Sequence, residues 1–201
     1  AYLEESEYLK RMNKAIPGIF NKLDGWNSHS YPNPGFISSP DLSGKGTVRT
    51  YQWEQDVLNE LGATKSLPIF ITETGWKHSE GIDYNPSLPS PETVAVYYKE
   101  AFSAAWNNSK IVAVTPFLLN YQEAPFDHFS FKKASKTVSI NVKDAALKDY
   151  HLPFYILKDM PKVKGSPIQE NKAKFIKGGI QKDNFTTTFE ATSSSYQASL
   201  V

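Results

Sequence analysis

Glu73 is the residue of this chain whose position most clearly suggests chemistry. It follows the apolar segment 68–72, which is typical of a buried strand, and it comes shortly before Gly75 and Trp76. Side chains alternate along a strand, which predicts one face made of Ile69, Ile71 and Glu73 and another made of Phe70, Thr72 and Thr74. In a barrel strand, the isoleucines would pack into the barrel interior and Glu73 would stand at the carboxyl mouth, where such barrels do chemistry. A strand-end acid that only caps a loop is the plainer alternative.

A second group of polar residues lies one predicted helix upstream. Asn27, His29 and Tyr31 alternate onto one face of a short predicted strand that also ends at a loop. His29 and Tyr31 are the best candidates for polar partners of a sugar, and a hydrogen-bonded core histidine is the competing interpretation of His29. Asn33, just after Tyr31, could also reach a substrate hydroxyl. This segment favours the interpretation of Glu73 as part of a sugar site over its interpretation as a loop cap.

The elements between these segments alternate as strand, helix and strand. An apolar stripe predicts a helix before the Glu73 strand, and Gly62 stands where a left-handed cap is wanted. That stripe consists of Val48, Tyr51, Val57, Leu58 and Leu61. Ser90 and Pro91 mark the next helix start as N-cap and first-turn proline. Its buried face is predicted to consist of Val94, Tyr97, Ala101, Ala104 and Ala105. The apolar run 111–119 is typical of a strand covered on both faces, and three successive βα units predict a parallel sheet.

Three segments carry a resemblance to a known family. They are DGWNSHSYP at 24–32, PIFITETGW at 68–76 and VAVTPFLLNYQEAPFDHFSF at 112–131. In order and spacing they resemble the sixth, seventh and eighth strands of the clan of (β/α)8-barrel glycoside hydrolases that cleave with retention, over roughly residues 20 to 165. The implied fold class is α/β, namely the C-terminal portion of a TIM barrel followed by the start of a β-sandwich domain.

The resemblance implies a double-displacement glycosidase that acts on a β-linked oligo- or polysaccharide. In that clan the nucleophile is a glutamate at the end of strand seven, which matches Glu73, and the acid/base is a glutamate on strand four, usually preceded by Asn. Nothing in this chain matches the second acid, because Asn59 and Glu60 fall inside a predicted helix. Glu73 would attack the anomeric carbon while an acid about 5 Å away protonates the leaving oxygen. The clan also implies that Tyr31 donates a hydrogen bond that orients the nucleophile.

Aromatic residues make up 13% of the chain, and sugars stack on aromatic rings. Trp76 is the best platform candidate, whereas the other three tryptophans are interpreted as packing residues. Asn120 is a further candidate for substrate binding, in a region where the clan frequently carries a tryptophan. Because of this departure, the residue that forms the floor of the corresponding subsite is left open. Glu123 and Asp127, after the last strand, are interpreted as rim residues that bind hydroxyls or cap the loop.

The chain is expected to be a piece of a longer protein, because 201 residues with three βα units cannot close a barrel that takes about 250 residues. Residues 1–165 are predicted to be the C-terminal part of the barrel. Residues 166–182 have the composition of a linker, and 183–201 are predicted to begin a truncated β-rich domain. The earlier strands, with the acid/base, belong upstream, so this piece alone is expected to be inactive.

Composition argues against several other classes. A formal net charge of +1 gives no reason to expect a nucleic-acid or anionic membrane partner. No apolar run approaches the roughly 18 residues of a membrane span, and no glycine-rich phosphate loop is present. Cysteine is absent and the 4 histidines lack ligand spacing, so we predict no metal and no cofactor, with a carbohydrate as the partner. The compartment and the oligomeric state stay open, and only the resemblance favours secretion or the cell surface.

Two other functional classes fit the same residues. A noncatalytic sugar-binding barrel would keep Trp76 and Tyr31 but lack the strand-four glutamate. A transglycosylase acting on cell-wall glycan would keep both acids and pass the glycosyl unit to another sugar. The upstream sequence would distinguish a noncatalytic barrel from a hydrolase, because only the hydrolase has the strand-four glutamate. Product analysis would distinguish a transglycosylase from a hydrolase.

Overall fold

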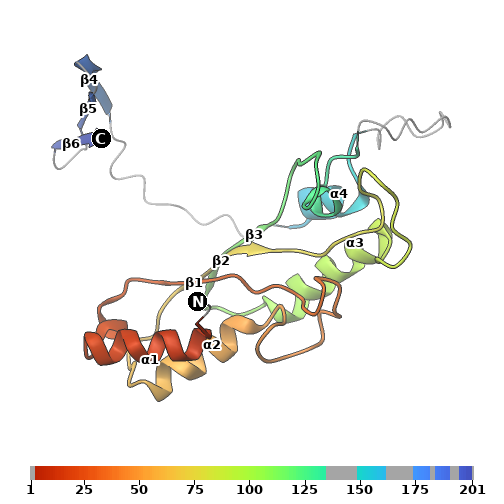
Figure 1. The fold of residues 1–201 in the computed structure, drawn as a ribbon, viewed down its shortest axis with the longest axis horizontal. Coiled ribbons are helices and arrows are strands. Elements are labelled where there is room, and N and C mark those ends of the chain that lie inside the picture. The colour runs from red at the N-terminus through yellow and green to blue at the C-terminus, as the bar shows by residue number, and fades with distance from the viewer. Residues whose placement is uncertain (1–2, 135–148, 162–173, 182–183, 191–194, 201) are drawn as a thin grey trace. The chain divides into compact units, whose positions relative to one another are not determined.

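A computed structural model describes residues 3–134, 149–161, 174–181, 184–190 and 195–200. The chain divides into two compact units, Ala1–Met160 and Pro161–Val201. The first unit contains the candidate site, and the second contains a separate small sheet (Figure 1).

A three-stranded parallel sheet organises the first unit. Its strands are β1 (Trp26–Ser28), β2 (Ile69–Thr74) and β3 (Ile111–Pro116), and they lie in the order β1-β2-β3. In the described part of this unit, four α-helices accompany the sheet: α1 (Glu5–Ala15), α2 (Thr50–Glu60), α3 (Pro91–Glu100) and α4 (Leu152–Asp159) (Figure 1). Short helical turns lie at Ile19–Lys22, Ala101–Ala105 and Asp127–Phe129. The predicted alternation of strands and helices in a parallel α/β arrangement is confirmed.

Local signals in the sequence explain where two of these helices begin or end. Ser90 caps α3 by accepting a hydrogen bond from the backbone nitrogen of Thr93 at 3.3 Å, and Pro91 occupies the first turn. Gly62 follows α2 with a φ of 88°, a left-handed conformation that suits glycine. Both of these predictions are confirmed.

The core lies between the sheet and the helices that follow its strands. Ile69 and Ile71 of β2 belong to one buried cluster with Tyr51 of α2 and with Val94 and Tyr98 of α3. The prediction that these isoleucines point into a barrel interior is therefore wrong, because they face the helices. A smaller cluster joins α1 to α2 through Leu9, Val57 and Leu58. Ala104, predicted to be buried, is exposed.

The opposite face of the sheet is uncovered within the part of the chain that the structure describes. Phe70 of β2 is 36% exposed and Val112 of β3 is 60% exposed. Thr72 and Ala113 are exposed as well. The prediction that strand 111–119 is covered on both faces is therefore wrong for the described residues. It is also too long, since β3 ends at Pro116.

The second unit is an antiparallel sheet of three strands in chain order, β4 (Lys174–Gln181), β5 (Asn184–Glu190) and β6 (Ser195–Leu200). The strands predicted near the end of the chain coincide with β5 and β6. Within the segment 166–182, predicted as a linker, Lys174–Gln181 form β4. None of the described helices is both long and apolar enough to cross a membrane.

Candidate functional site

Glu73 lies at the carboxyl end of β2, where the loops that follow parallel strands meet. The Tyr31 hydroxyl donates a hydrogen bond to Glu73 Oε2 at 3.2 Å, and Nδ1 of His29 lies 3.5 Å from the same oxygen. His29 and Tyr31 come from the segment just after β1, the strand that pairs with β2. The structure therefore brings together three of the residues that the sequence singled out.

A shift in strand register accompanies the placement of Glu73. Ile71 pairs with Val114 and Thr74 pairs with Pro116, so β2 has one residue more than β3 over this interval. Thr74 is buried, and its hydroxyl donates to the carbonyl oxygen of Ser30 at 2.7 Å. The strict alternation predicted for 69–74 is therefore wrong at its end. The Glu73 side chain remains 43% exposed beside this buried residue.

A pocket of about 490 Å³ opens beside Glu73. Its lining consists of Tyr31, Phe36, Glu73, Lys77, Phe117, Pro125, Phe126 and Phe129. The rings of this wall pack edge to face, for example Tyr31 against Phe36 with centroids 5.2 Å apart and Phe36 against Phe129 at 5.3 Å. Such a mixture of apolar rings with few polar groups is typical of a small-molecule or sugar site.

Tyr31 is held as a hydrogen-bond donor by its surroundings. Burial raises the pKa of its hydroxyl above the usual range, and the negative charge of Glu73 raises it further. Edge contacts with Phe117 and Phe129 fix the orientation of its ring. The Tyr31 hydroxyl therefore keeps its proton at neutral pH and directs it at the Glu73 carboxylate.

Trp76 does not line this pocket. Its indole is 1% exposed and packs against Tyr97, Tyr98 and Trp106. Its Nε1 donates to the carbonyl oxygen of Ser38 at 2.7 Å. The expectation that Trp76 stands at the cleft wall as a sugar platform is therefore not met, and this indole is a core residue.

Asn33 and Asn120 also lie outside the pocket lining. Asn33 is exposed, and its carbonyl oxygen accepts a hydrogen bond from the Ser38 hydroxyl at 2.6 Å. Asn120 is exposed, and its Oδ1 accepts from Gln122 Nε2 at 2.8 Å. The structure places both side chains in loops, and it does not bring either of them to Glu73.

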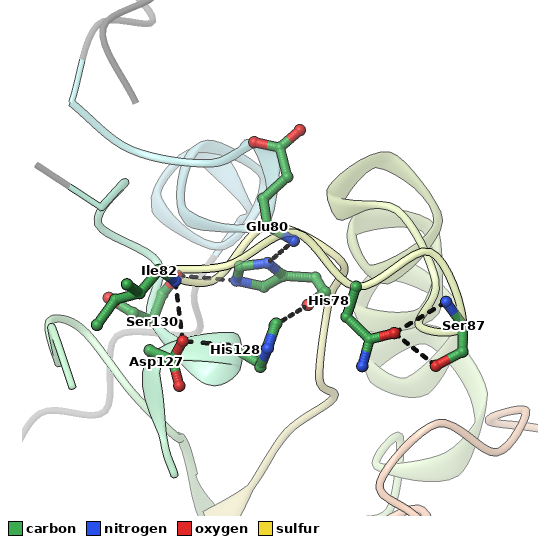
Figure 2. A network of polar contacts seen from close by, with 8 residues as sticks. His78, Glu80, Ile82, Ser87, Asp127, His128 and Ser130 are labelled. Atoms are coloured by element: carbon green, nitrogen blue, oxygen red, sulfur yellow. Dashed lines mark hydrogen bonds and ion pairs between the residues drawn. The ribbon is translucent and has the colours of Figure 1, made fainter. Parts of the chain in front are cut away.

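The loop that follows Glu73 is fastened to the loop that follows β3 by a polar network (Figure 2). His78 Nε2 lies 2.9 Å from the carbonyl oxygen of Ser130, which can only accept, so Nε2 carries the proton. His78 Nδ1 then accepts from the backbone nitrogen of Glu80 at 3.3 Å. In return, His128 Nδ1 donates to the carbonyl oxygen of His78 at 2.8 Å. Both ring nitrogens of His78 are thus used in its neutral form.

Burial of the His78 ring, together with the nearby His128, lowers its pKa to about 4. Asp127 adds a further bond between the two loops, because its Oδ2 accepts from the backbone nitrogen of Ile82 at 2.9 Å. A Cβ on Gly81 would collide with that carboxylate oxygen and with the His128 ring, so a side chain there would displace the groups that join the two loops. Asp127 therefore caps a loop, one of the two roles expected for it.

Sequence reasoning missed most of the aromatic wall and one charged residue. Phe36 and Phe126 come from loops, Phe117 follows the end of β3 and Phe129 ends the short helical turn Asp127–Phe129, so no shared local pattern groups them. Lys77 lies next to Trp76 in the sequence, and its position near the strand end was a usable signal. Among the described residues, no group of three or more His, Cys, Asp or Glu side chains is placed to hold a metal ion.

Comparisons of the chain with protein-family models, with curated proteins and with solved structures gave no match in any of the three. The geometry around Glu73 therefore carries the functional argument.

Proposed function

We propose that this chain is part of a retaining glycoside hydrolase that acts on a β-linked oligo- or polysaccharide, with Glu73 as the nucleophile. The observation that carries the proposal is the hydrogen bond from Tyr31 to Glu73 at 3.2 Å, in an aromatic-lined pocket at the carboxyl end of a parallel sheet. In this proposal the sheet is the C-terminal part of a (β/α)8 barrel, the architecture that places catalytic side chains at this end of its strands.

The residues of the site take distinct roles in this mechanism. Glu73 Oε1 attacks the anomeric carbon, while Oε2 is held by Tyr31 and His29. Fixing one oxygen aims the other, which lowers the entropic part of the barrier. The aromatic wall offers rings to the apolar face of a pyranose. Water then releases the sugar from the covalent intermediate.

The second acid of the mechanism is proposed to come from an upstream strand. Among the residues that line the pocket in the described part of the chain, Glu73 is the only carboxylate. A retaining enzyme needs a second carboxyl group about 5 to 5.5 Å from the nucleophile. This same observation favours one alternative, a noncatalytic sugar-binding protein, if the upstream strands bring no acid.

Replacement of the nucleophile tests the proposal. In the full-length protein, Glu73→Gln should lower turnover of aryl β-glycosides roughly 10³-fold or more, because the amide cannot form the covalent intermediate. Oligosaccharide binding, measured by calorimetric titration, should persist. Glu60→Gln, an exposed change on α2, is the matched control and should be active.

A mechanism-based fluoroglycoside should also label wild-type protein at Glu73, as seen by peptide mass spectrometry. Normal turnover by Glu73→Gln would overturn the assignment. Sugar binding without any turnover by the wild type would support the noncatalytic alternative.

A further inference from the structure

Lys77 gives the pocket a positive charge that the proposed chemistry at Glu73 does not use. Its side chain lines the same pocket as Glu73. Its ammonium group lies over two rings of the wall, 5.4 Å from the centroid of Phe36 and 5.7 Å from that of Phe129. The backbone nitrogen of Lys77 also donates to the carbonyl oxygen of Phe36 at 3.0 Å. These contacts hold the charge against the aromatic wall.

This ammonium group lacks an anionic partner in the described part of the chain. No carboxylate of those residues lies within 4.0 Å of Lys77, and Glu73 pairs instead with Tyr31 and His29. An ammonium group has three N–H donors, and aromatic rings offer its charge no oxygen acceptor. Its donors are therefore available to a ligand in the pocket.

We infer that Lys77 recognises an anionic group on the substrate, so that the glycan carries a uronic acid carboxylate or a sulfate ester close to the sugar bound at Glu73. This inference rests on the proposed function, since it assigns a specificity to the same site. It makes Lys77 a specificity-determining residue.

The free N–H donors of Lys77, and not the net charge of the pocket, favour an anionic group over a neutral hydroxyl. Glu73 and Lys77 are the two charged residues of the lining in the described part of the chain. An ionised Glu73 would repel a carboxylate or a sulfate nearby, and Lys77 offsets that repulsion. A hydrogen bond between two ionised groups is roughly twice as strong as one between neutral groups. A hydroxyl would accept from Lys77 but would bring no negative charge to it, so its hydrogen bond would be weaker.

A simpler role for Lys77 would be to balance the charge of Glu73. In that case Lys77→Met would affect neutral and anionic substrates to the same extent. The two roles are therefore distinguished by a ratio between substrates.

Binding to the full-length protein tests the inference without depending on turnover. Matched β-linked oligosaccharides in neutral, uronate and sulfate-ester forms are titrated calorimetrically into wild type, Glu73→Gln, Lys77→Met and Lys77→Arg. We expect the wild type to prefer one anionic form, and Lys77→Met to weaken that form about 10-fold with a much smaller effect on the neutral form. Lys77→Arg should keep most of the preference. Lys99→Met, an exposed change on α3, should behave as wild type. The better of the two anionic forms identifies the group.

The outcomes separate this inference from the proposed function. Equal affinity for all three forms, an equal loss for all forms in Lys77→Met, or no binding at all would overturn the role of Lys77. If neutral glycosides are cleaved and cleavage depends on Glu73, the hydrolase proposal survives that result. If anionic forms bind through Lys77 and none is cleaved, the inference stands and the hydrolase proposal fails.

Discussion

Tyr31 and Trp76 are both large aromatic residues close to Glu73, and the structure gives them opposite surroundings. Tyr31 lines the pocket and donates to the carboxylate. Trp76 packs in the core, where its indole N–H bonds the carbonyl oxygen of Ser38. A buried indole needs such a partner, and a sugar platform needs an accessible ring face. Tyr31 therefore acts at the site, whereas Trp76 stabilises the base of the loop that leaves it.

Trp76→Ala should lower the free energy of unfolding by about 3–5 kcal/mol, the usual cost of replacing a buried tryptophan with alanine. Denaturant unfolding of the full-length protein measures it. Tyr84→Ala is the control in the same loop, since Tyr84 is 70% exposed, and it should cost less than about 1 kcal/mol. An unchanged melting curve for Trp76→Ala, together with weaker sugar binding, would instead show that Trp76 binds sugar at the cleft wall.

The position of a residue could be predicted from the sequence when the interactions that fix it involve residues nearby in the chain. The Gly62 cap and the Ser90 cap depend on neighbours within a few positions, and the sequence predicted both. The contact of Tyr31 with Glu73 was expected only from the family resemblance, and the structure has it at the carboxyl ends of two paired parallel strands. The burial of Trp76 depends on Tyr98 and Trp106, which belong to a later part of the chain, and no local pattern contains that information.

At the scale of elements, α1 packs against α2 through an apolar cluster and one pair of acids. Glu54 of α2 is 4% exposed, and its Oε2 accepts from Trp26 Nε1 at 2.7 Å. Glu5 of α1 lies close enough to Glu54 for the two carboxyl groups to influence each other. Burial raises the pKa of Glu5 to about 7, and the negative charge of Glu54 contributes to the rise. Burial raises the pKa of Glu54 as well, so the two acids favour holding a proton between pH 4.5 and about 7.

This proton makes the contact between α1 and α2 dependent on pH. Because the pKa of Glu5 rises on folding from 4.5 to about 7, its contribution to stability is fully present below pH 4.5 and is lost as the pH rises through about 7. Glu5→Gln keeps a hydrogen-bond donor at every pH. We therefore expect the free energy of unfolding of wild type to fall relative to Glu5→Gln between pH 5 and about pH 8.

Denaturant unfolding of both proteins across this range measures the difference. His78 and His151, whose pKa values fall to about 4 and about 3 mainly through burial, act in the opposite direction. Their effect is common to both proteins and cancels. Glu7→Gln is the matched control on α1, because Arg11 lowers the pKa of Glu7. A constant difference between wild type and Glu5→Gln across this range would show that folding does not raise the pKa of Glu5.

At the scale of the whole molecule, the first unit has an apolar sheet face with no cover among the described residues. Phe70 and its partner Ala113 lie on this face, the neighbouring Val112 is 60% exposed, and β1 and β3 are the edge strands of the sheet. Both an exposed apolar patch and an unpaired edge favour association between chains. If the proposed barrel is correct, its other strands would cover this face.

Residues 1–201 expressed alone should therefore self-associate, and Val112→Lys should reduce that association by placing a charge on the sheet face. Light scattering as a function of concentration measures the effect. Val96→Lys is the control, because Val96 is a 49% exposed residue of α3 away from the sheet. A sharply melting monomer, or an equal response to both lysines, would contradict the role assigned to this face.

The extra residue that β2 carries between Ile71 and Thr74 separates two requirements on one short strand. Ile69 and Ile71 must match the helices, and Glu73 must match the pocket. In a strictly alternating strand both requirements would depend on the same odd-numbered positions, so any slip that repaired the packing would also misdirect the acid. The register shift lies after Ile71, so Glu73 no longer shares the side of the two isoleucines. Without the extra residue Glu73 would share the helix-facing side of Ile69 and Ile71, whereas with it Thr74 takes the next buried position and Glu73 stays at the pocket.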